Sequence, residues 1–323
     1  MHAWRGHAHG APESLVFEEV ADAPLPDGAM RLAIRASAVN FPDVLFVAGT
    51  YQVKPTPPFI PGFEVAGEVV ESRAEGFPVG TRVASTLDGQ GGYATHAIAY
   101  PYNTFRVPNA MSDVDAAALT ITYQTAWFAL HRRARLQAGQ TVLVHAGAGG
   151  VGSAAIQVAR AAGARVIATA GGPDKVAVCR ALGADVSIDY RSEDFVAVVK
   201  RETGGRGADV VFDPVGGDVF DKSTKCIAFE GNIVVIGFTS GRVPEARANH
   251  VLVKNYGVLG LHWGAYNLHD PQSIHAAQAA LYRLYEEGAV KPLVSAVRPL
   301  AEAREAMQSV ASRGTTGKVV LQP

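Results

Sequence analysis

The stretch Thr141-Val-Leu-Val-His-Ala-Gly-Ala-Gly-Gly-Val-Gly152 decides the fold. Its apolar first half predicts a buried strand over 141–146, and the apolar spacing that follows predicts a helix over 151–162. Three glycines between them fit the pattern G-x-G-x-x-G, which allows a sharp turn and a close approach to a pyrophosphate. The free amides at a helix N-terminus attract such an anion. We therefore expect the following residues to bind a dinucleotide: Ala146, Gly147, Gly149, Gly150, Val151 and Gly152.

The alternative is a glycine-rich turn that only packs a helix against a strand. The surrounding pattern favours the dinucleotide site, because strands and helices alternate along the next part of the chain. Strands are predicted over 165–170, 186–189, 210–213 and 232–237, and helices over 116–134, 173–182 and 195–203. Such alternation is typical of an α/β, doubly wound parallel sheet.

The two ends of the chain are β-rich. Short apolar segments such as 31–39, 64–70 and 81–84 are separated by Pro and Gly, and the proline cluster at 54–61 predicts a loop. The last part predicts a helix over 274–288 and then a strand-rich tail. We therefore expect a nucleotide-binding domain, residues 120–262, inserted between two parts of a β-rich domain, residues 1–119 and 263–323.

Composition narrows the class of protein. The chain has 323 residues, of which 48% are hydrophobic and 18% charged, so it can bury a sizeable core. Its formal net charge of -1 argues against nucleic acid as a partner. Its two cysteines, Cys179 and Cys226, form no disulfide framework and fit a cytoplasmic location. The sequence shows no signal peptide and no apolar run long enough for a membrane helix.

The second strand of the nucleotide-binding domain indicates which cofactor binds. It ends in Ala168-Thr-Ala-Gly-Gly-Pro-Asp-Lys175, without the acidic residue that usually binds the ribose of NAD. Gly171 leaves room for a 2′-phosphate, Lys175 and Arg191 are cations able to pair with it, and Tyr190 is placed to cover it. We therefore expect NADPH, although Asp174 argues the other way and Lys175 also fits an ordinary solvated position.

Several motifs then carry a resemblance to a known family. They are Asn40-Phe-Pro-Asp43, Pro61-Gly-Phe-Glu-Val-Ala-Gly-Glu-Val69, Gly91-Gly-Tyr-Ala94, Thr125-Ala-Trp127, the phosphate loop and Gly317-Lys-Val-Val320. In this order they resemble the medium-chain dehydrogenase/reductase family over essentially the whole chain. The resemblance implies a GroES-like catalytic domain, a Rossmann domain and an active site in the cleft between them.

The resemblance also implies that no zinc is bound. Zinc-dependent members place a Cys-His pair just before the aspartate of the first motif, where this chain has Asn40, Phe41 and Pro42. They carry Gly-His-Glu in the second motif, where Phe63 stands here, and phenylalanine does not ligate zinc. Only a short glycine-rich loop, with Gly89 among its residues, stands in place of the cysteine-rich structural zinc lobe.

Among zinc-free members, the chain is similar to the NADPH:quinone oxidoreductase (zeta-crystallin-like) branch. This similarity rests on Asn40-Phe-Pro-Asp-Val-Leu45 and Gly49-Thr-Tyr-Gln52. The expected substrate is a small hydrophobic electrophile, which accepts hydride without a Lewis acid. Tyr51 is a candidate for hydrogen bonding the acceptor oxygen, Asn40 for contacting substrate or ribose, and Asp43 for orienting Asn40. Tyr51 also fits as a cover for the proline-rich loop, and Asn40 as the cap of a short helix.

Further site residues follow from the same resemblance. Phe46, Phe63 and Trp127 are candidates for an aromatic substrate pocket, although core packing suits each of them. Residues expected near the cofactor are Thr125, Gly237, Phe238, His262, Trp263 and Arg313, with Lys318 as a further candidate. The segment 257–265 is expected to pair with a second copy in a homodimer.

Two other functions stay open. A reductase of enones, alkenals or enoyl thioesters has the same fold and cofactor, but it needs a proton donor for the α-carbon, a role that Tyr51 fits. A non-catalytic NADPH-binding protein, acting as a sensor or structural protein, comes from a different class.

Overall fold

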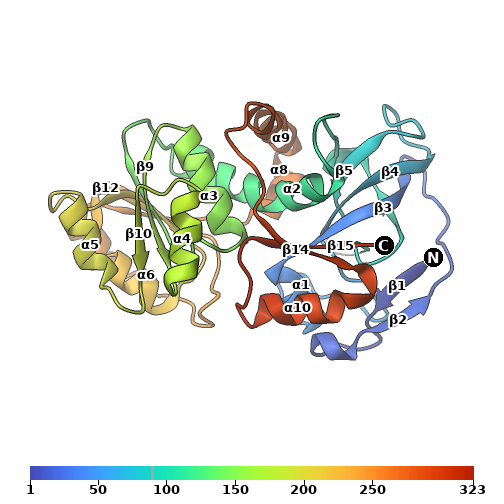
Figure 1. The fold of residues 1–323 in the computed structure, drawn as a ribbon, viewed down its shortest axis with the longest axis horizontal. Helices are drawn as coiled ribbons and strands as arrows, with labels where there is room; N and C mark the ends of the chain where they lie inside the picture. The colour runs from blue at the N-terminus through green and yellow to red at the C-terminus, as the bar shows by residue number, and fades with distance from the viewer. Residues whose placement is uncertain (89–90) are drawn as a thin grey trace. The chain divides into compact units, whose positions relative to one another are not determined.

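A computed structural model describes residues 1–88 and 91–323, and Figure 1 shows its course. The chain is α/β, with a β-rich part and a parallel sheet, as predicted. Gly89, in the expected glycine-rich loop, lies outside the described residues. Among the described residues, no helix combines the length and apolar character needed to cross a membrane.

The chain divides into two compact units. Unit 1 comprises Met1–Ile121, His269–Gln278 and Pro292–Pro323, and unit 2 comprises Thr122–Leu268 and Ala279–Lys291. Each unit is therefore built from segments that lie far apart in the sequence. The domain boundaries expected at 119/120 and 262/263 stay predictions.

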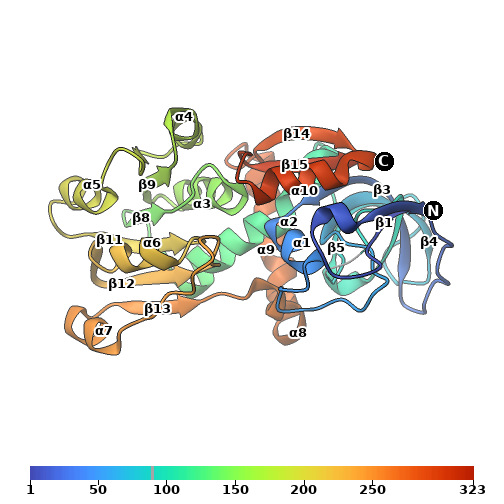
Figure 2. The same cartoon turned by 90° about the horizontal axis from the view of Figure 1, so that it is seen from below.

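Unit 2 contains a six-stranded sheet in which every neighbouring pair is parallel. Its strands, in sheet order, are β10 (Val186–Asp189), β9 (Arg165–Ala170), β8 (Thr141–Val144), β11 (Ala208–Asp213), β12 (Ile227–Val235) and β13 (Gly257–Gly260). Figure 2 shows β9, β8, β11, β12 and β13 one below another, with α7 (Ala248–Lys254) beside β13. All these strands therefore end at one edge, where ligands of doubly wound sheets bind.

The helices of unit 2 agree with the pattern where the apolar spacing is strong. They are α3 (Gly150–Ala161), α4 (Pro173–Ala181), α5 (Phe195–Glu202) and α6 (Gly217–Ser223), besides α7. The first three were predicted to within one or two residues at each end. The pattern did not predict α6 and α7, and α7 has no buried residue that would produce apolar spacing.

The long helix expected over 116–134 consists of two parts. α2 (Asp113–Trp127) begins at Asp113, with the Ser112 hydroxyl accepting from the Asp115 amide at 3.1 Å. The wider turns of a π-helix follow over Phe128–Arg133. The helix therefore starts three residues earlier than expected, because a serine cap and two acidic residues form its first turn.

Unit 1 contains a seven-stranded sheet and a separate two-stranded pair. The sheet consists of β14 (Val294–Pro299), β15 (Lys318–Gln322), β3 (Met30–Val39), β4 (Glu64–Ser72), β5 (Arg82–Thr86) and β7 (Thr104–Arg106) in order, with β6 (His96–Ala99) paired to β3; β1 (His2–Arg5) pairs with β2 (Val16–Glu19). β15 pairs antiparallel with β3, so that Val320 lies opposite Ala38. The end of the chain thus completes the sheet begun near its start.

Two helices cover the core of unit 1. α1 (Phe41–Val47) and α10 (Ala303–Ala311) lie side by side (Figure 1) and share a cluster with Trp4 and Tyr93. The expectation of a strand-rich tail was wrong for α10. Ala303, Ala306 and Met307 bury one face of this helix, which a strand would divide between two faces. The helix expected over 274–288 is α9 (Pro271–Glu286), which follows the single turn of α8 (Tyr266–His269).

Candidate functional site

The phosphate loop follows β8, and its shape depends on glycines, which have no side chain. Ala146 adopts a left-handed φ of 51°, and Gly149 caps α3. A Cβ on Gly152 would lie 2.1 Å from the Ala146 carbonyl oxygen, so this position requires glycine. A Cβ on Gly147 would lie 2.8 Å from the Cys179 sulfur, so the loop also sits tightly on the helix behind it.

This loop fits the pyrophosphate of a dinucleotide. The first amides of an α-helix have no partner within the helix, so Gly150, Val151 and Gly152 present N–H groups at the start of α3. The helix dipole adds a partial positive charge at the same end. The expected pyrophosphate-binding residues therefore lie together at the carboxyl edge of the sheet.

Behind the loop, His145 is enclosed within unit 2. Its side chain lies between the Thr169 hydroxyl, 3.0 Å from Nδ1, and the Ser223 hydroxyl, 2.8 Å from Nε2. Burial lowers the pKa of His145 to about 4, and the nearby Asp213 carboxylate only partly opposes this effect. The imidazole is thus neutral at physiological pH and positions the end of β8.

A second candidate phosphate-binding region, around Gly171 and Gly172, lies at the ends of β9 and β10. A Cβ on Gly171 would lie 2.5 Å from the Tyr190 hydroxyl and 3.1 Å from Arg191 Nε, and one on Gly172 would lie 3.2 Å from Arg191 Nη1. The two glycines therefore face a tyrosine and a guanidinium. Lys175 lies in the first turn of α4, beside the same loop.

The carboxylate of Asp189 also lies near these glycines, but it binds the backbone. Its Oδ1 accepts from the Gly172 amide at 2.9 Å and from the Arg191 amide at 3.0 Å. These two bonds hold the pKa of Asp189 below its ordinary value. The chain therefore places a cation and a hydroxyl beside the glycines, which suits a 2′-phosphate.

The residues expected near the nicotinamide fall in both units. Gly237 and Phe238 follow β12. The Phe238 ring lies close to Gly216, because a Cβ on Gly216 would be 3.1 Å from a carbon of that ring. His262 is exposed after β13, and the Trp263 indole donates to Gln124 Oε1 at 3.1 Å. Thr125, on α2, is buried in unit 2. Arg313 belongs to unit 1, just after α10, with a left-handed φ of 57°.

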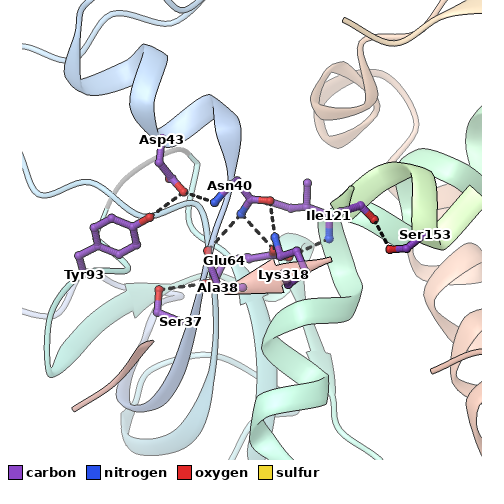
Figure 3. A network of polar contacts seen from close by, with 10 residues as sticks. Ser37, Ala38, Asn40, Asp43, Glu64, Tyr93, Ile121, Ser153 and Lys318 are labelled. Atoms are coloured by element: carbon purple, nitrogen blue, oxygen red, sulfur yellow. Dashed lines mark hydrogen bonds and ion pairs between the residues drawn. The ribbon is translucent and has the colours of Figure 1, made fainter. Parts of the chain in front are cut away.

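Unit 1 contains a buried polar network, drawn in Figure 3. The Lys318 ammonium donates to Asn40 Oδ1 at 2.5 Å and to Glu64 Oε1 at 2.7 Å. The other oxygen of Glu64 accepts from the Ile121 amide at 2.8 Å. Lys318 is 4% exposed and Glu64 1%, so each charge is paired where water is excluded. The network joins β15, β4, the start of α1 and α2.

Lys318 is thus buried and paired within unit 1, and its expected place near the cofactor stays a prediction. A buried ammonium needs a counter-charge, and Glu64 supplies it within unit 1. The sequence did contain a signal, because a glutamate and a lysine stand directly before short runs without a charge, Val65-Ala-Gly67 and Val319-Val-Leu321. Charged residues are rarely buried unless they are paired, so the two belong together.

Asn40 has little hydrogen-bonding capacity left for a ligand. Its Nδ2 donates to the Ala38 carbonyl at 3.2 Å and to Glu64 Oε1 at 3.0 Å, which uses both of its hydrogens. Its Oδ1 accepts from Lys318. Asn40 also begins α1 as its N-cap residue, so it acts as a positioning residue of the loop.

Asp43 lies in the first turn of α1 and is fully buried. Its Oδ2 accepts from the Asn40 amide at 2.6 Å and from the Tyr93 hydroxyl at 2.8 Å (Figure 3). Burial raises the pKa of Asp43 to about 7, despite these two hydrogen bonds and the charge of Lys318. Asp43 therefore contacts the backbone of Asn40 and not its side chain.

Tyr51 lies against a small aromatic group in unit 1. Its ring meets Phe63 edge-on at 5.5 Å, and Phe63 meets Phe46 edge-on at 5.4 Å. Phe46 is 2% exposed and packs within the core, whereas Phe63 is half-buried. Trp127 belongs to unit 2, and its ring is tilted against that of His131 with ring centres 4.1 Å apart. The three expected pocket residues thus have different surroundings.

Comparison with known proteins follows the same division of the chain. The profile of the alcohol dehydrogenase GroES-like domain matches residues 26–109, and that of the zinc-binding dehydrogenase family matches residues 150–280. A quinone oxidoreductase-like protein 2 homolog of Nematostella vectensis is 40% identical over 296 residues, covering 90% of this chain and 81% of that protein.

The chain belongs to the medium-chain dehydrogenase/reductase family, in its quinone oxidoreductase-like branch. It is an oxidoreductase of that family. The structure of Escherichia coli quinone oxidoreductase complexed with NADPH is similar to this chain, with a TM-score of 0.93 and 30% identity. The match covers 100% of this chain and 100% of that one. A 2-haloacrylate reductase structure has a TM-score of 0.88 and 32% identity, covering 100% of this chain and 99% of that one.

Zinc-dependent members of the family have zinc ligands at certain positions. In this chain the residues at these positions make other contacts. Asn40 and Glu64 bind the Lys318 ammonium, and Phe63 packs against Phe46. No group of three or more His, Cys, Asp or Glu side chains within residues 1–88 and 91–323 has a geometry suited to a metal ion. A fixed cation is thus already paired where the family resemblance would place the metal.

Proposed function

We propose that this oxidoreductase reduces small quinones with NADPH by direct hydride transfer, without zinc. One observation carries the proposal: the Asn40–Lys318–Glu64 network, in which every polar group at the zinc-ligand positions already has a partner. A site built this way offers no Lewis acid to polarise an alcohol or a simple ketone. A quinone is already electrophilic and needs little such help.

NADPH is the cofactor, and the residues present fit it. The pyrophosphate would rest on the amides that begin α3, and the 2′-phosphate would lie at Gly171, beside Tyr190, Arg191 and Lys175. Bound NADPH supplies a hydride from C4 of its nicotinamide. We assign the nicotinamide end to Thr125, Gly237, Phe238, His262, Trp263 and Arg313.

In this proposal Tyr51 is the acceptor-side residue that delivers a proton. Burial raises the pKa of its hydroxyl above the ordinary value, and the negative charge of Asp43 adds to this effect. The phenol thus stays protonated at physiological pH and is able to donate to a developing oxyanion or carbanion. Phe63 supports the ring of Tyr51 edge-on. Phe46 packs against Phe63 within the core of unit 1, and Trp127 stays a further aromatic candidate.

A second candidate is a reductase of activated carbon–carbon double bonds. The 32% identity to a 2-haloacrylate reductase favours it, because the acceptor of that protein is an electron-poor alkene. This reaction needs proton delivery to the α-carbon, which Tyr51 would perform. An enoyl thioester would additionally need a basic groove for its phosphate groups.

An acceptor panel tests the proposal. Purified protein would be offered NADPH or NADH together with 1,4-benzoquinone, an alkenal or crotonyl-CoA, and nicotinamide oxidation would be followed. The proposal predicts fastest turnover with NADPH and benzoquinone. Turnover of the alkenal without the quinone would favour the second candidate. Tight NADPH binding without turnover of any acceptor would indicate a non-catalytic binding protein.

We also propose that the enzyme is a cytoplasmic homodimer. β13 is an edge strand of the parallel sheet, and the neighbouring α7 exposes 76% of Leu252 and 78% of Val253. An unpaired edge beside exposed apolar side chains suits pairing with a second copy. Both cysteines are free and buried, which suits a reducing compartment.

A further inference from the structure

The turn that contains Tyr51 follows directly on the end of α1. Gly49 adopts a left-handed φ of 70° in this turn. The amides of Thr50 and Tyr51 both donate to the Leu45 carbonyl, at 2.9 and 3.2 Å. Many helices end in this way, with a left-handed glycine and amides that bond back to the last turn. The position of Tyr51 is therefore tied to the end of α1.

A second segment of the chain, residues 6–10, lies against the same helix end. Gly6 pairs with Phe59 through two backbone hydrogen bonds, of 2.8 and 3.0 Å. The Gly10 amide donates to the Val47 carbonyl at 3.0 Å. Val47 is the last residue of α1, where a helix has no further amide of its own to offer its carbonyl groups. Residues 6–10 thus cap α1 from outside the helix.

The ring of His9, within this segment, contacts the turn itself. A Cβ on Gly49 would lie 2.8 Å from His9 Cγ and 2.9 Å from Nδ1, so the ring occupies the space of the absent side chain. The same ring stacks on Phe59, with ring centres 5.8 Å apart and planes inclined by 27°. His9 therefore contacts both the turn before Tyr51 and the proline-rich loop.

Aromatic contacts connect His9 with Tyr51 by a second route. Phe59 meets Phe46 edge-on, with ring centres 5.6 Å apart. Phe46 in turn meets Phe63 at 5.4 Å, and Phe63 meets Tyr51 at 5.5 Å. Edge-on aromatic pairs attract one another beyond the burial of their area. The rings thus form a continuous row of contacts that begins at His9 and ends at Tyr51.

We propose that His9 is a positioning residue that fixes the Tyr51 hydroxyl for proton delivery to the acceptor. The inference rests on the proposed function, in which Tyr51 donates that proton. A proton donor has to lie within hydrogen-bonding reach of the receiving atom, and a misplacement of about 1 Å costs about a hundredfold in rate. Gly49 has no side chain to restrict its backbone, so the His9 ring limits the movement of the turn.

The variant His9→Ala tests this role with two acceptors. It is expected to lower kcat about tenfold with an alkenal, because the α-carbon needs a well-placed proton donor. The loss with 1,4-benzoquinone is expected to be smaller, because a hydroquinonate is weakly basic. The Kd for NADPH is expected to stay unchanged, since both phosphate-binding regions lie in unit 2 and His9 lies in unit 1.

Two further variants separate positioning from a general effect on the fold. His9→Phe keeps a flat ring against Gly49 and Phe59, so it is expected to restore most of the activity. His7→Ala is the matched control, because His7 lies in the same segment but contacts Glu18, 3.1 Å from its Nε2. Equal losses of kcat in His9→Ala and His7→Ala, or in His9→Ala and His9→Phe, would overturn the role.

Fluorine NMR gives a readout that needs no acceptor. In protein that contains 3-fluorotyrosine, the resonance of residue 51 is the one that Tyr51→Phe lacks. His9→Ala is expected to shift and broaden this resonance, whereas His9→Phe and His7→Ala are expected to keep it near its wild-type position. A His9 that only stabilises the fold would lower the urea midpoint and leave the resonance and kcat of the folded protein unchanged.

The outcomes distinguish this inference from the proposed function. A Tyr51 resonance that does not respond to His9→Ala, in wild-type protein that transfers hydride, would overturn the positioning role alone. NADPH binding without hydride transfer to either acceptor would overturn the proposed function and the role with it, even where the resonance responds.

Discussion

At the scale of single residues, the phosphate loop depends on glycines, because a side chain at these positions would not fit. Gly152 lies so close to the Ala146 carbonyl that a methyl group would force the turn apart. Gly171 and Gly172 lie so close to Tyr190 and Arg191 that a Cβ at either position would crowd these side chains. The cofactor fit therefore rests on steric room as much as on attractive groups.

Gly152→Ala is expected to weaken NADPH binding about a hundredfold, because the added Cβ moves amides that should face the pyrophosphate. Titration of NADPH against protein fluorescence would measure the change. Gly260→Ala, in β13 of the same unit, is a control because a Cβ at that position would meet nothing within 4 Å. Equal NADPH affinity in the two variants would contradict the assigned role of the loop.

Arg191→Ser is expected to raise the Kd for NADPH about tenfold and to leave that for NADH nearly unchanged. The guanidinium lies beside Gly171 and Gly172, where a 2′-phosphate would bind, and NADH has no such group. Parallel titrations with the two cofactors would measure the change in preference. An equal loss for both cofactors would show that Arg191 supports the fold of the loop instead.

At the scale of elements, the sequence predicted those with strong apolar spacing and missed those without it. β9 and β10 agree with the predicted strands at both ends, since buried parallel strands are short apolar runs. α7 was missed because it buries none of its residues. α10 was missed although its Ala, Arg, Glu, Met and Gln residues suit a helix, since the neighbouring apolar tail suggested strands.

The candidate site was predictable where it depends on local backbone and not where it depends on long-range pairing. The phosphate loop is one continuous stretch, so its residues lie together by chain connectivity. The network of Asn40, Glu64 and Lys318 joins positions up to 278 apart, and no local pattern shows which groups meet. Asn40 was therefore expected to contact a ligand, whereas its amide is used mainly within the network.

The enclosed imidazole behind β8 predicts a loss of stability in acid. The pKa of His145 is about 4 in the folded chain, against an ordinary value of 6.5. Between these values the unfolded chain binds the proton more tightly, so the contribution of His145 to the free energy of unfolding falls as the pH drops from 6.5 towards 4, by up to roughly 3 kcal/mol. The pKa of Asp43 is raised, so its contribution to the free energy of unfolding increases as the pH drops.

Urea unfolding of the wild type and of His145→Gln over this range would measure the effect. The variant retains a polar side chain between Thr169 and Ser223 but lacks the titrating group. Its stability is expected to fall less steeply than that of the wild type below pH 6.5. Identical slopes for the two proteins would contradict the assignment.

At the scale of the whole molecule, the two ends of the chain are joined in one unit. β15 supplies three buried apolar residues to the sheet and the Lys318 ammonium to the network. Unit 1 is thus completed only when the last residues have been added to β3 and β14. The buried ion pair fixes this closure, because each charge is costly without the other.

Lys318→Met is expected to lower the free energy of unfolding by about 3–5 kcal/mol, because it leaves the Glu64 carboxylate buried without its cation. The double variant Lys318→Met with Glu64→Gln removes both charges and is expected to recover part of this loss. Chemical denaturation of the three proteins would measure the coupling. Additive losses would mean that the two charges do not act as a pair.

We propose that NADPH delivers hydride at a site where the paired Lys318 ammonium takes the place of zinc. The most direct test is a single turnover of chelator-treated protein with NADPH deuterated at the transferred position and 1,4-benzoquinone. The account predicts stoichiometric NADPH oxidation with a primary isotope effect, at a rate that added zinc leaves unchanged. Oxidation that appears only when zinc is restored would contradict it.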